Sequence, residues 1–204
     1  MAVNLVKGQK VSLVKESPSM RSLRVGLGWD EAEQKKGFLG SLFGSKPADI
    51  DCDASVILCG ADGKVVPGGI NQCLVYYRNL THPSGAIRHC GDNLTGGGDG
   101  DDEQILVDLQ LLPANVQKLV FVVNIYDADV KRQHFGMIRN AFIHITDTQA
   151  GKELCRYNLT DDFSGYTGLV VGELDRNGGQ WEFTAVGRGV QSASRLDALI
   201  RLYS

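Results

Sequence analysis

Residues 168–186 read Gly-Leu-Val-Val-Gly-Glu-Leu-Asp-Arg-Asn-Gly-Gly-Gln-Trp-Glu-Phe-Thr-Ala-Val. The segments 168–174 and 181–186 are short and rich in β-branched and aromatic residues, which favour strands. Between them, Arg176-Asn-Gly-Gly contains the Asn-Gly pair that is typical of a tight hairpin turn. This stretch therefore predicts two antiparallel strands joined by a turn.

The same pattern extends over most of the chain. A second hairpin turn is indicated by Ala61-Asp-Gly-Lys. Further strands are predicted at 10–15, 22–27, 51–59, 73–78, 104–109, 119–126, 141–146 and 153–157. About ten short strands with few helices predict an all-β fold, a β-sandwich of two packed sheets. At 204 residues, the chain is expected to form one domain over 1–204.

A few short helices are expected beside the strands. One is predicted within 127–137, with Asp127 or Asp129 as its N-cap. A second is predicted at the C-terminus, with Ser194 as its N-cap and Asp197 completing a capping box. Its apolar residues recur at helical spacing, so one face should pack on a sheet; they are Leu196, Leu199, Ile200 and Tyr203.

Composition and charge exclude several classes of protein. The net charge is −3, and no basic run or basic–aromatic stripe indicates a nucleic-acid partner. No apolar run reaches the roughly 18 residues of a membrane span, and the N-terminus resembles no signal peptide. We therefore expect a cytoplasmic protein. Its five cysteines lack CxxC spacing and are predicted to be free thiols, with Cys52, Cys59 and Cys73 buried.

An acidic, glycine-rich segment spans residues 92–103, Asp-Asn-Leu-Thr-Gly-Gly-Gly-Asp-Gly-Asp-Asp-Glu. Like charges this close repel unless water solvates them or a cation neutralises them. Glycines let the backbone curl so that oxygen atoms converge, and many hard oxygen ligands suit Ca²⁺. We predict a calcium site here, with a solvated acidic loop as the alternative.

Two features lie upstream of this segment. Asp51 and Asp53 are two residues apart at the start of a strand, so both side chains should point to one face. Residues 31–48 interrupt the strand pattern and are expected to form an insertion loop. Its apolar residues are Phe38, Leu39, Leu42 and Phe43. They either fold back onto the sandwich or form a contact surface for a partner or a membrane.

The chain resembles the TerD family of tellurium-resistance and general stress proteins. The matching motifs run nearly end to end. They are Leu5-Val-Lys-Gly, Val11-Ser-Leu, Gly26-Leu-Gly-Trp-Asp30, Asp51-Cys-Asp-Ala-Ser55, Gly91-Asp-Asn-Leu-Thr-Gly96, Gly98-Asp-Gly-Asp-Asp-Glu103, Ile125-Tyr-Asp-Ala, Gln133-His-Phe-Gly136, Arg156-Tyr-Asn-Leu and Trp181-Glu-Phe-Thr-Ala-Val-Gly187.

The resemblance implies a calcium-binding β-sandwich without known catalysis, in which these acidic motifs line adjoining Ca²⁺ sites. Carried over by motif, the candidate ligands are Asp30, Asp51, Asp53, Asp92, Asn93, Asp99, Asp101, Asp102 and Glu103, with the carbonyls of Leu94 and Gly100 as possible additions. The chain departs from the family at Gly97, where a glutamate usually stands, and in the length of the 31–48 insertion.

These features lead to one main hypothesis and several alternatives. In the main hypothesis, Ca²⁺ orders the acidic loop, which then contacts a protein partner in a stress-response complex. A metal-dependent phosphoester hydrolase is the enzyme alternative, with His82 and His89 as its reachable bases, although ordinary loop histidines are the simpler interpretation. A C2-like module docking on membranes through calcium is another. A nucleotide-binding loop at 96–100 is disfavoured because it lacks the P-loop Lys-Ser/Thr ending.

Overall fold

The computed structural model describes residues 2–31, 50–91 and 100–204. Twelve strands are found in these residues. They are β1 (Val3–Leu5), β2 (Lys10–Ser12), β3 (Ser22–Glu31), β4 (Cys52–Cys59), β5 (Leu74–Val75), β6 (Ile87–His89), β7 (Glu103–Asp108), β8 (Lys118–Ile125), β9 (Ile138–Asp147), β10 (Lys152–Asn158), β11 (Gly168–Asn177) and β12 (Gln180–Val190). The helices are α1 (Leu13–Glu16), α2 (Ile70–Cys73), α3 (Ala128–Lys131) and α4 (Leu196–Ile200), with 3₁₀ turns η1 (Phe135–Met137) and η2 (Arg201–Tyr203).

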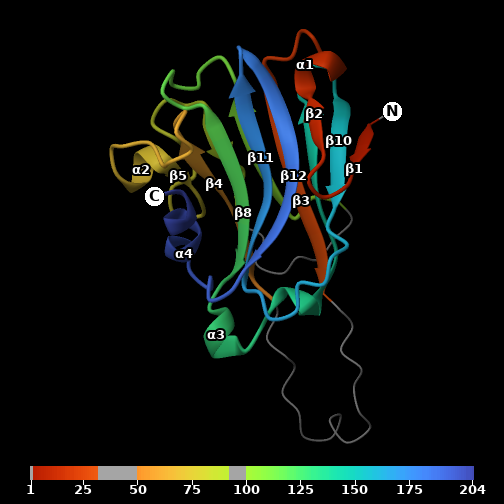
Figure 1. Cartoon of the computed structure of the whole chain (residues 1–204), viewed down its shortest axis with the longest axis vertical. Helices are drawn as coiled ribbons and strands as arrows, with labels where there is room; N and C mark the ends of the chain where they lie inside the picture. The colour runs from red at the N-terminus through yellow and green to blue at the C-terminus, as the bar shows by residue number, and fades with distance from the viewer. Residues whose placement is uncertain (1, 32–49, 92–99) are drawn as a thin grey trace, which may run out of the picture.

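The strands form two six-stranded sheets, which confirms the predicted sandwich (Figure 1). The first sheet has the order β1-β10-β9-β3-β7-β6, and the second has the order β2-β12-β11-β8-β4-β5. All neighbours are antiparallel except β1 and β10. The four edge strands have only two or three residues each. Short edges offer little backbone for pairing with another chain.

The quoted hairpin is present as predicted. Strands β11 and β12 pair down to Asn177 and Gln180, and Gly178 and Gly179 form the turn with φ of 57° and 81°. Positive φ at both central positions is what a turn matching the twist of the strands requires, and glycine adopts it without steric cost.

Between the sheets lies a core built from alternating inward positions. In β7 the buried residues alternate with half-buried ones, and in β12 Phe183 and Ala185 are fully buried. All eight residues of β4 are buried, so this strand is covered on both faces. Continuous burial explains why residues 52–59 read as an apolar run rather than an alternating one.

The C-terminal helix packs on the second sheet, as predicted (Figure 1). Leu199 is fully buried against β11, where a Cβ on Gly168 would lie 3.3 Å from Cδ2 of Leu199. The hydroxyl of Tyr203 donates to Glu173 (2.9 Å), whose carboxylate also pairs with Lys118 at 2.6 Å. The predicted capping box is wrong, because Arg195 is the N-cap and the Ser194 hydroxyl donates to Asp129.

Several local predictions need correction. The predicted strand 10–15 ends at Ser12 and turns into α1, and 73–78 contributes only two strand residues, after α2. The helix expected over 127–137 is split into α3 and η1. Asp127 is the N-cap residue of α3, as predicted, but it is in the left-handed region (φ 52°) and its side chain makes no capping hydrogen bond. The short edge strands β1 and β6 were not predicted because three residues carry too little pattern.

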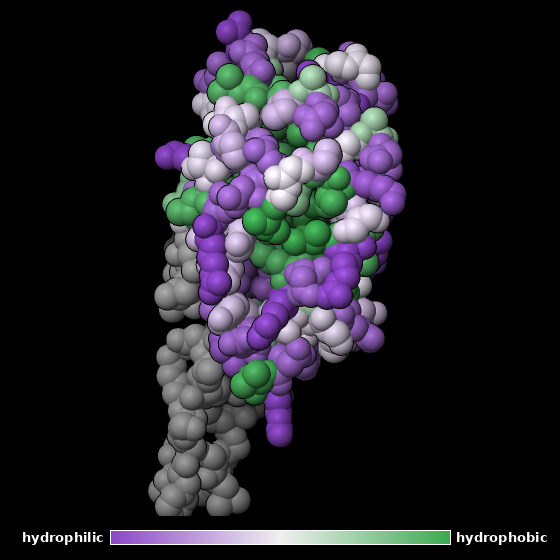
Figure 2. Space-filling view, turned by 90° about the vertical axis from the view of Figure 1, so that its left-hand side faces the viewer, coloured by the Kyte–Doolittle hydropathy of each residue, from purple (hydrophilic) through white to green (hydrophobic). Residues whose placement is uncertain are grey.

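One side of the molecule exposes apolar surface. On the face that carries α2 and the C-terminus, hydrophobic residues gather at the centre and hydrophilic residues surround them (Figure 2). Ile70 in α2 is 47% exposed and Leu202 in η2 is 44% exposed. This side contains the short edge strand β5 of the second sheet.

The turn after β9 depends on a buried carboxylate. Asp147 is 1% exposed and accepts hydrogen bonds from the Ser17 hydroxyl (2.6 Å) and from the N–H groups of Gln149 and Ala150. Burial opposes ionisation, but these hydrogen bonds and the charge of Lys152 outweigh it and hold the pKa of Asp147 below its ordinary value.

We therefore expect Asp147→Asn to lower the free energy of unfolding by about 1–3 kcal/mol at neutral pH, because an amide nitrogen replaces a bonded oxygen. A lowered pKa contributes stability that is complete above the unfolded-state pKa, about 3.9, and is lost as pH falls through the folded-state value. In urea titrations the difference between the two proteins should be constant from about pH 5 to 7 and close below about pH 4. Asp108→Asn, at a more exposed turn aspartate, is the control; a difference that persists at low pH would contradict this account.

Candidate metal centre

The described part of the acidic segment, Gly100 to Glu103, leads into β7 beside the end of β3. Its three carboxylates diverge. Glu103 pairs with Leu27 and faces the interior, whereas Asp101 lies on the outer face, where a Cβ on Gly26 would meet it at 2.4 Å. Asp102 lies between them, with its N–H bonded to the Leu27 carbonyl.

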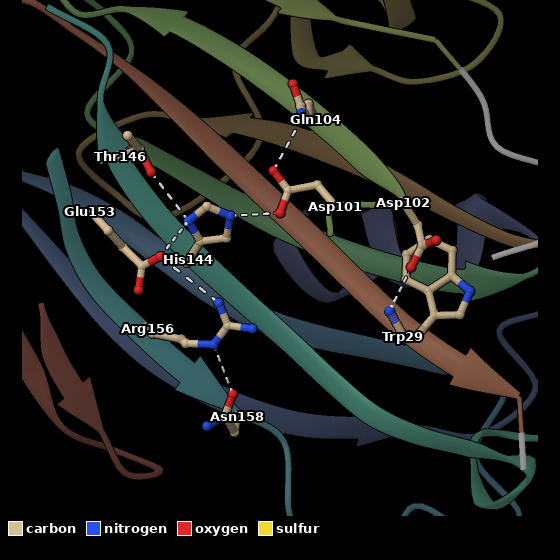
Figure 3. Close-up of polar contacts among 9 residues, drawn as sticks. All are labelled: Trp29, Asp101, Asp102, Gln104, His144, Thr146, Glu153, Arg156 and Asn158. Carbon is tan, nitrogen blue, oxygen red and sulfur yellow. Dashed lines mark hydrogen bonds and ion pairs between the residues drawn. The ribbon is translucent and has the colours of Figure 1, made fainter. Parts of the chain in front are cut away.

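On the outer face, Asp101 belongs to a polar network that crosses the first sheet (Figure 3). One of its oxygens lies 2.6 Å from His144 Nε2 on β9, and the other accepts from the Gln104 amide at 3.1 Å. The other ring nitrogen of His144 lies 3.2 Å from Thr146 Oγ1 and 3.4 Å from Glu153 on β10. His144, 7% exposed, therefore holds Asp101 against the sheet.

Asp102 is attached to β3 through the backbone. Its carboxylate accepts from the N–H of Trp29 at 2.7 Å (Figure 3). Burial raises the pKa of Asp102, the Trp29 hydrogen bond opposes the rise, and the charges of Asp30 and Asp101 add to it. The negative charges of Asp30 and Asp101 thus both act on Asp102.

The Asp30 side chain is oriented by β9. Its carboxylate accepts from the Asn140 amide at 2.7 Å, and Asn140 takes a left-handed backbone conformation (φ 53°) at that position. Asp30 and Gly100 line a cavity of about 770 Å³ together with residues of β9 and β10 that include Arg139 and Arg156. The carboxylate of Asp30 and the backbone of Gly100, which belongs to the acidic segment, thus border the same cavity.

Glu103 crosses between the two sheets. Its carboxylate, 2% exposed as a residue, accepts from the N–H of Ala54 on β4 at 2.6 Å and lies 3.3 Å from His89 Nε2. The same His89 nitrogen lies 3.2 Å from the Ala54 carbonyl. Because β5 pairs only with Val56 and Ile57, the Ala54 edge of β4 lies beyond its reach. Glu103 and His89 supply the hydrogen bonds that a neighbouring strand would otherwise provide.

The aspartates of β4 lie next to this link. Asp53 is 4% exposed and is paired across the sheet with Asn124, while Asp51 precedes the strand and its carbonyl accepts from the Tyr126 N–H. Asp53 lines a second cavity, of about 320 Å³, on the outer side of the second sheet. Asp53 directly precedes Ala54 in β4. The hydrogen bond from the Ala54 N–H to Glu103 therefore links the strand that carries Asp53 to the acidic segment 92–103.

The predicted ligands Asp92, Asn93 and Asp99, and the Leu94 carbonyl, lie outside the described residues, as do Phe38, Leu39, Leu42 and Phe43 of the 31–48 insertion. Over 2–31, 50–91 and 100–204, no three Asp, Glu, His or Cys side chains converge closely enough to hold a metal ion. The predicted ligand set therefore stays a prediction.

Of the two histidines expected in a loop, His82 lies in one, whereas His89 is the last residue of β6. Both are 2% exposed. His82 is bound to Ser84 and to the Gln72 carbonyl, and His89 to Ala54 and Glu103. His144 was not predicted to touch the acidic segment. Its place in Phe-Ile-His-Ile-Thr, with His144 alternating with Ile143 and Ile145, was the available signal, since it marks a polar residue on the outer face. The cysteines are free as predicted, with Cys52, Cys59 and Cys73 buried.

Comparison with known proteins identifies the family. The family model described as the TerD domain matches residues 1–203. The chain belongs to the TerD family.

Relatives of known name agree with this assignment. The stress response protein SCP2 of Bacillus subtilis is 45% identical over 203 residues and is covered end to end, as is this chain. The tellurium resistance protein TerZ of Serratia marcescens is 48% identical over 185 residues, which cover 91% of this chain and 89% of TerZ. The named relatives of this TerD protein are therefore stress response and tellurium resistance proteins.

A solved structure of a TerD homologue from Streptomyces coelicolor A3(2) superposes with a TM-score of 0.63. It is 23% identical, and the match covers 88% of this chain and 96% of that one. At this identity the likeness concerns the fold, and it agrees with the sandwich described above. Within the described residues, no helix combines the length and the apolar character needed to cross a bilayer.

The Glu103 link predicts a stability effect that does not depend on metal. We expect Glu103→Ala to lower the free energy of unfolding by about 3 kcal/mol in the presence of chelator, since it removes the buried carboxylate that accepts from the Ala54 N–H and lies beside His89. A Glu103→Ala/His89→Ala double mutant should lose less than the sum of the singles. Glu153→Ala, at a more exposed glutamate of β10, is the matched control and should cost under about 1 kcal/mol. Additive losses, or no loss in chelator, would show that Glu103 does not hold β4.

Proposed function

We propose that this TerD protein is a non-catalytic stress-response protein in which Ca²⁺ orders the acidic segment 92–103 and the ordered segment contacts a protein partner. The observation that carries the proposal is the arrangement at the point where the acidic segment joins β7. Asp101 is held beside His144 and Asp102 on the Trp29 N–H, and the negative charges of Asp30 and Asp101 act on Asp102 and repel it. A bound cation would relieve this repulsion.

The donor set fits a hard cation. The candidate side chains are carboxylates with one amide, and Ca²⁺ accepts six to eight such oxygens in loose geometry. The Gly100 carbonyl lies 2.8 Å from where a Cβ on Gly28 would be, so this backbone oxygen approaches β3 near Trp29. When bound, Ca²⁺ would supply positive charge among these oxygens.

The residues of the sheet give the segment a fixed base. His144 and Gln104 hold Asp101, Trp29 holds Asp102, and Glu103 is anchored on β4. Only the preceding residues would then need to be ordered, which lowers the entropic cost of closing the loop. A loop closed on a rigid sheet can present a defined surface to another protein.

The hydrolase alternative is disfavoured by the histidines. His82 and His89 are buried and hydrogen-bonded, so neither is placed to take a proton from a metal-bound water. The membrane-docking alternative rests on apolar residues of the 31–48 insertion, outside the described residues. Neither alternative has an observation in its favour comparable with the charges of Asp30, Asp101 and Asp102 that favour the calcium proposal.

The test is isothermal titration of Ca²⁺ into chelator-stripped protein, with Mg²⁺ as competitor. We expect saturable binding of one or two ions, and a gain in unfolding free energy of about 2.7 kcal/mol at a free concentration 100 times Kd. Asp99→Ala and Asp101→Asn should weaken the binding, whereas Asp108→Asn, an aspartate at the far end of β7, should not. Absence of saturation would mean that the segment is a solvated acidic loop.

A further inference from the structure

The second cavity, of about 320 Å³, has a polar base. It is bordered by β4, β8, the residues after β5 and the start of α4. Asp53 and Asn124 are cross-strand partners, so their side chains stand together on the outer face of the second sheet. They are 4% and 2% exposed.

Asn124 has an unused acceptor at this base. Its side-chain carbonyl oxygen is buried and accepts no hydrogen bond from the residues that the structure describes. An unsatisfied buried acceptor costs about 1–3 kcal/mol, and such groups in native proteins call for an explanation. The Asp53 carboxylate and the Asn124 carbonyl oxygen are both acceptors, so a ligand group with N–H donors and a positive charge would complement them.

Aromatic rings form one wall. Tyr76 and Tyr77 meet edge to face with centroids 5.3 Å apart, and Tyr77 and Tyr126 do so at 6.4 Å. Ring faces attract cations, and here Arg78 lies 5.3 Å over Tyr77 and Lys131 lies 5.6 Å over Tyr126. Burial raises the pKa of Tyr77; the charge of Arg78 opposes the rise, and the charge of Asp53 adds to it.

The rim has the opposite charge. Arg78 and Arg195 both line the cavity and are exposed, while the carboxylate lies at the base. A ligand complementary to this arrangement has a cation at one end and an anion at the other. The volume, at the lower end of the range for ligand pockets, fits a small molecule.

We propose that this cavity binds a small zwitterion whose ammonium or guanidinium group is held by Asp53 and Asn124 and whose anionic group faces Arg78 and Arg195. The tyrosine wall packs against the cationic end. This binding does not require Ca²⁺, although Asp53 is also a candidate metal ligand, so the two activities must be measured separately.

The first experiment titrates the chelator-treated full chain with L-arginine, L-lysine and O-phosphoethanolamine. At least one should bind with Kd below about 1 mM. If it is arginine, then L-citrulline, which has a neutral urea in place of the guanidinium, and agmatine, which lacks the carboxylate, should each bind about tenfold more weakly. For lysine, the corresponding analogues are N6-acetyl-lysine and cadaverine; for phosphoethanolamine, they are ethyl phosphate and ethanolamine. Failure of all three zwitterions to bind, or equal binding of the neutral analogue, overturns the proposal.

The decisive variant is Asn124→Leu, which keeps the side-chain size and removes the acceptor. Binding should weaken about tenfold or more, while the melting temperature stays the same or rises, because an unsatisfied buried polar group is lost. Asn115→Leu, at an exposed loop asparagine, is the control and should leave binding unchanged. A purely structural Asn124 would instead lower the melting temperature and leave binding intact, which would overturn the proposal.

Measuring calcium binding of the same variants distinguishes this cavity from the acidic segment. Asp99→Ala should lose calcium binding and keep zwitterion binding, whereas Asn124→Leu should show the reverse. If Ca²⁺ instead displaces the zwitterion competitively, or Asn124→Leu abolishes calcium binding, then Asn124 and Asp53 serve the metal and the zwitterion site is refuted.

Discussion

The hydrogen bond from the Ala54 N–H to Glu103 joins the two sheets at the end where the acidic segment enters the fold. Strand β4 is buried along its whole length, yet its edge partner β5 covers only Val56 and Ile57. The Ala54 N–H and carbonyl would therefore be buried donors and acceptors without a strand to pair with, each costing about 1–3 kcal/mol. Glu103 and His89 bond to them from the opposite sheet.

The same contact divides the acidic segment into parts with different roles. Glu103 contacts the Ala54 N–H and His89 in the interior. It is therefore the predicted ligand whose presence is best explained without a metal. Asp101 and Asp102 are held by His144 and by the Trp29 N–H, on the outer side and at the edge of β3. Burial is the main cause of the raised pKa of Asp102, and the negative charges of Asp30 and Asp101 add to it. Negative charge gathered on a rigid base is a starting point from which a cation can order the residues before it.

The fold could be predicted from sequence because its strands carry strong local patterns. The 168–186 hairpin and the apolar run of β8 indicate strands by composition and turn chemistry alone, and the two sheets follow from the need to bury them. The candidate site was harder to predict, since its contacts join residues far apart in the chain. His89 bonds a residue 35 positions away, and His144 bonds one 43 positions away, so no spacing rule relates them. Short elements such as β1 and α1 were missed or misassigned because tertiary packing outweighs propensity over three or four residues.

Buried polar side chains are concentrated around the start of β4. Asp53, Ser55, His89, Glu103 and Asn124 are each at most 4% exposed, within or beside strands whose other residues are mostly apolar. Apolar residues at these positions would fit a sandwich core at lower energetic cost, because each polar group must recover its lost hydration through a hydrogen bond. For Glu103 and His89 the recovery is visible in the Ala54 contacts. For the side-chain oxygens of Ser55 and Asn124 no partner is found among the described residues. A stability requirement accounts for the first pair and not for the second, so the outer face of β4 and β8 is where binding chemistry should be sought.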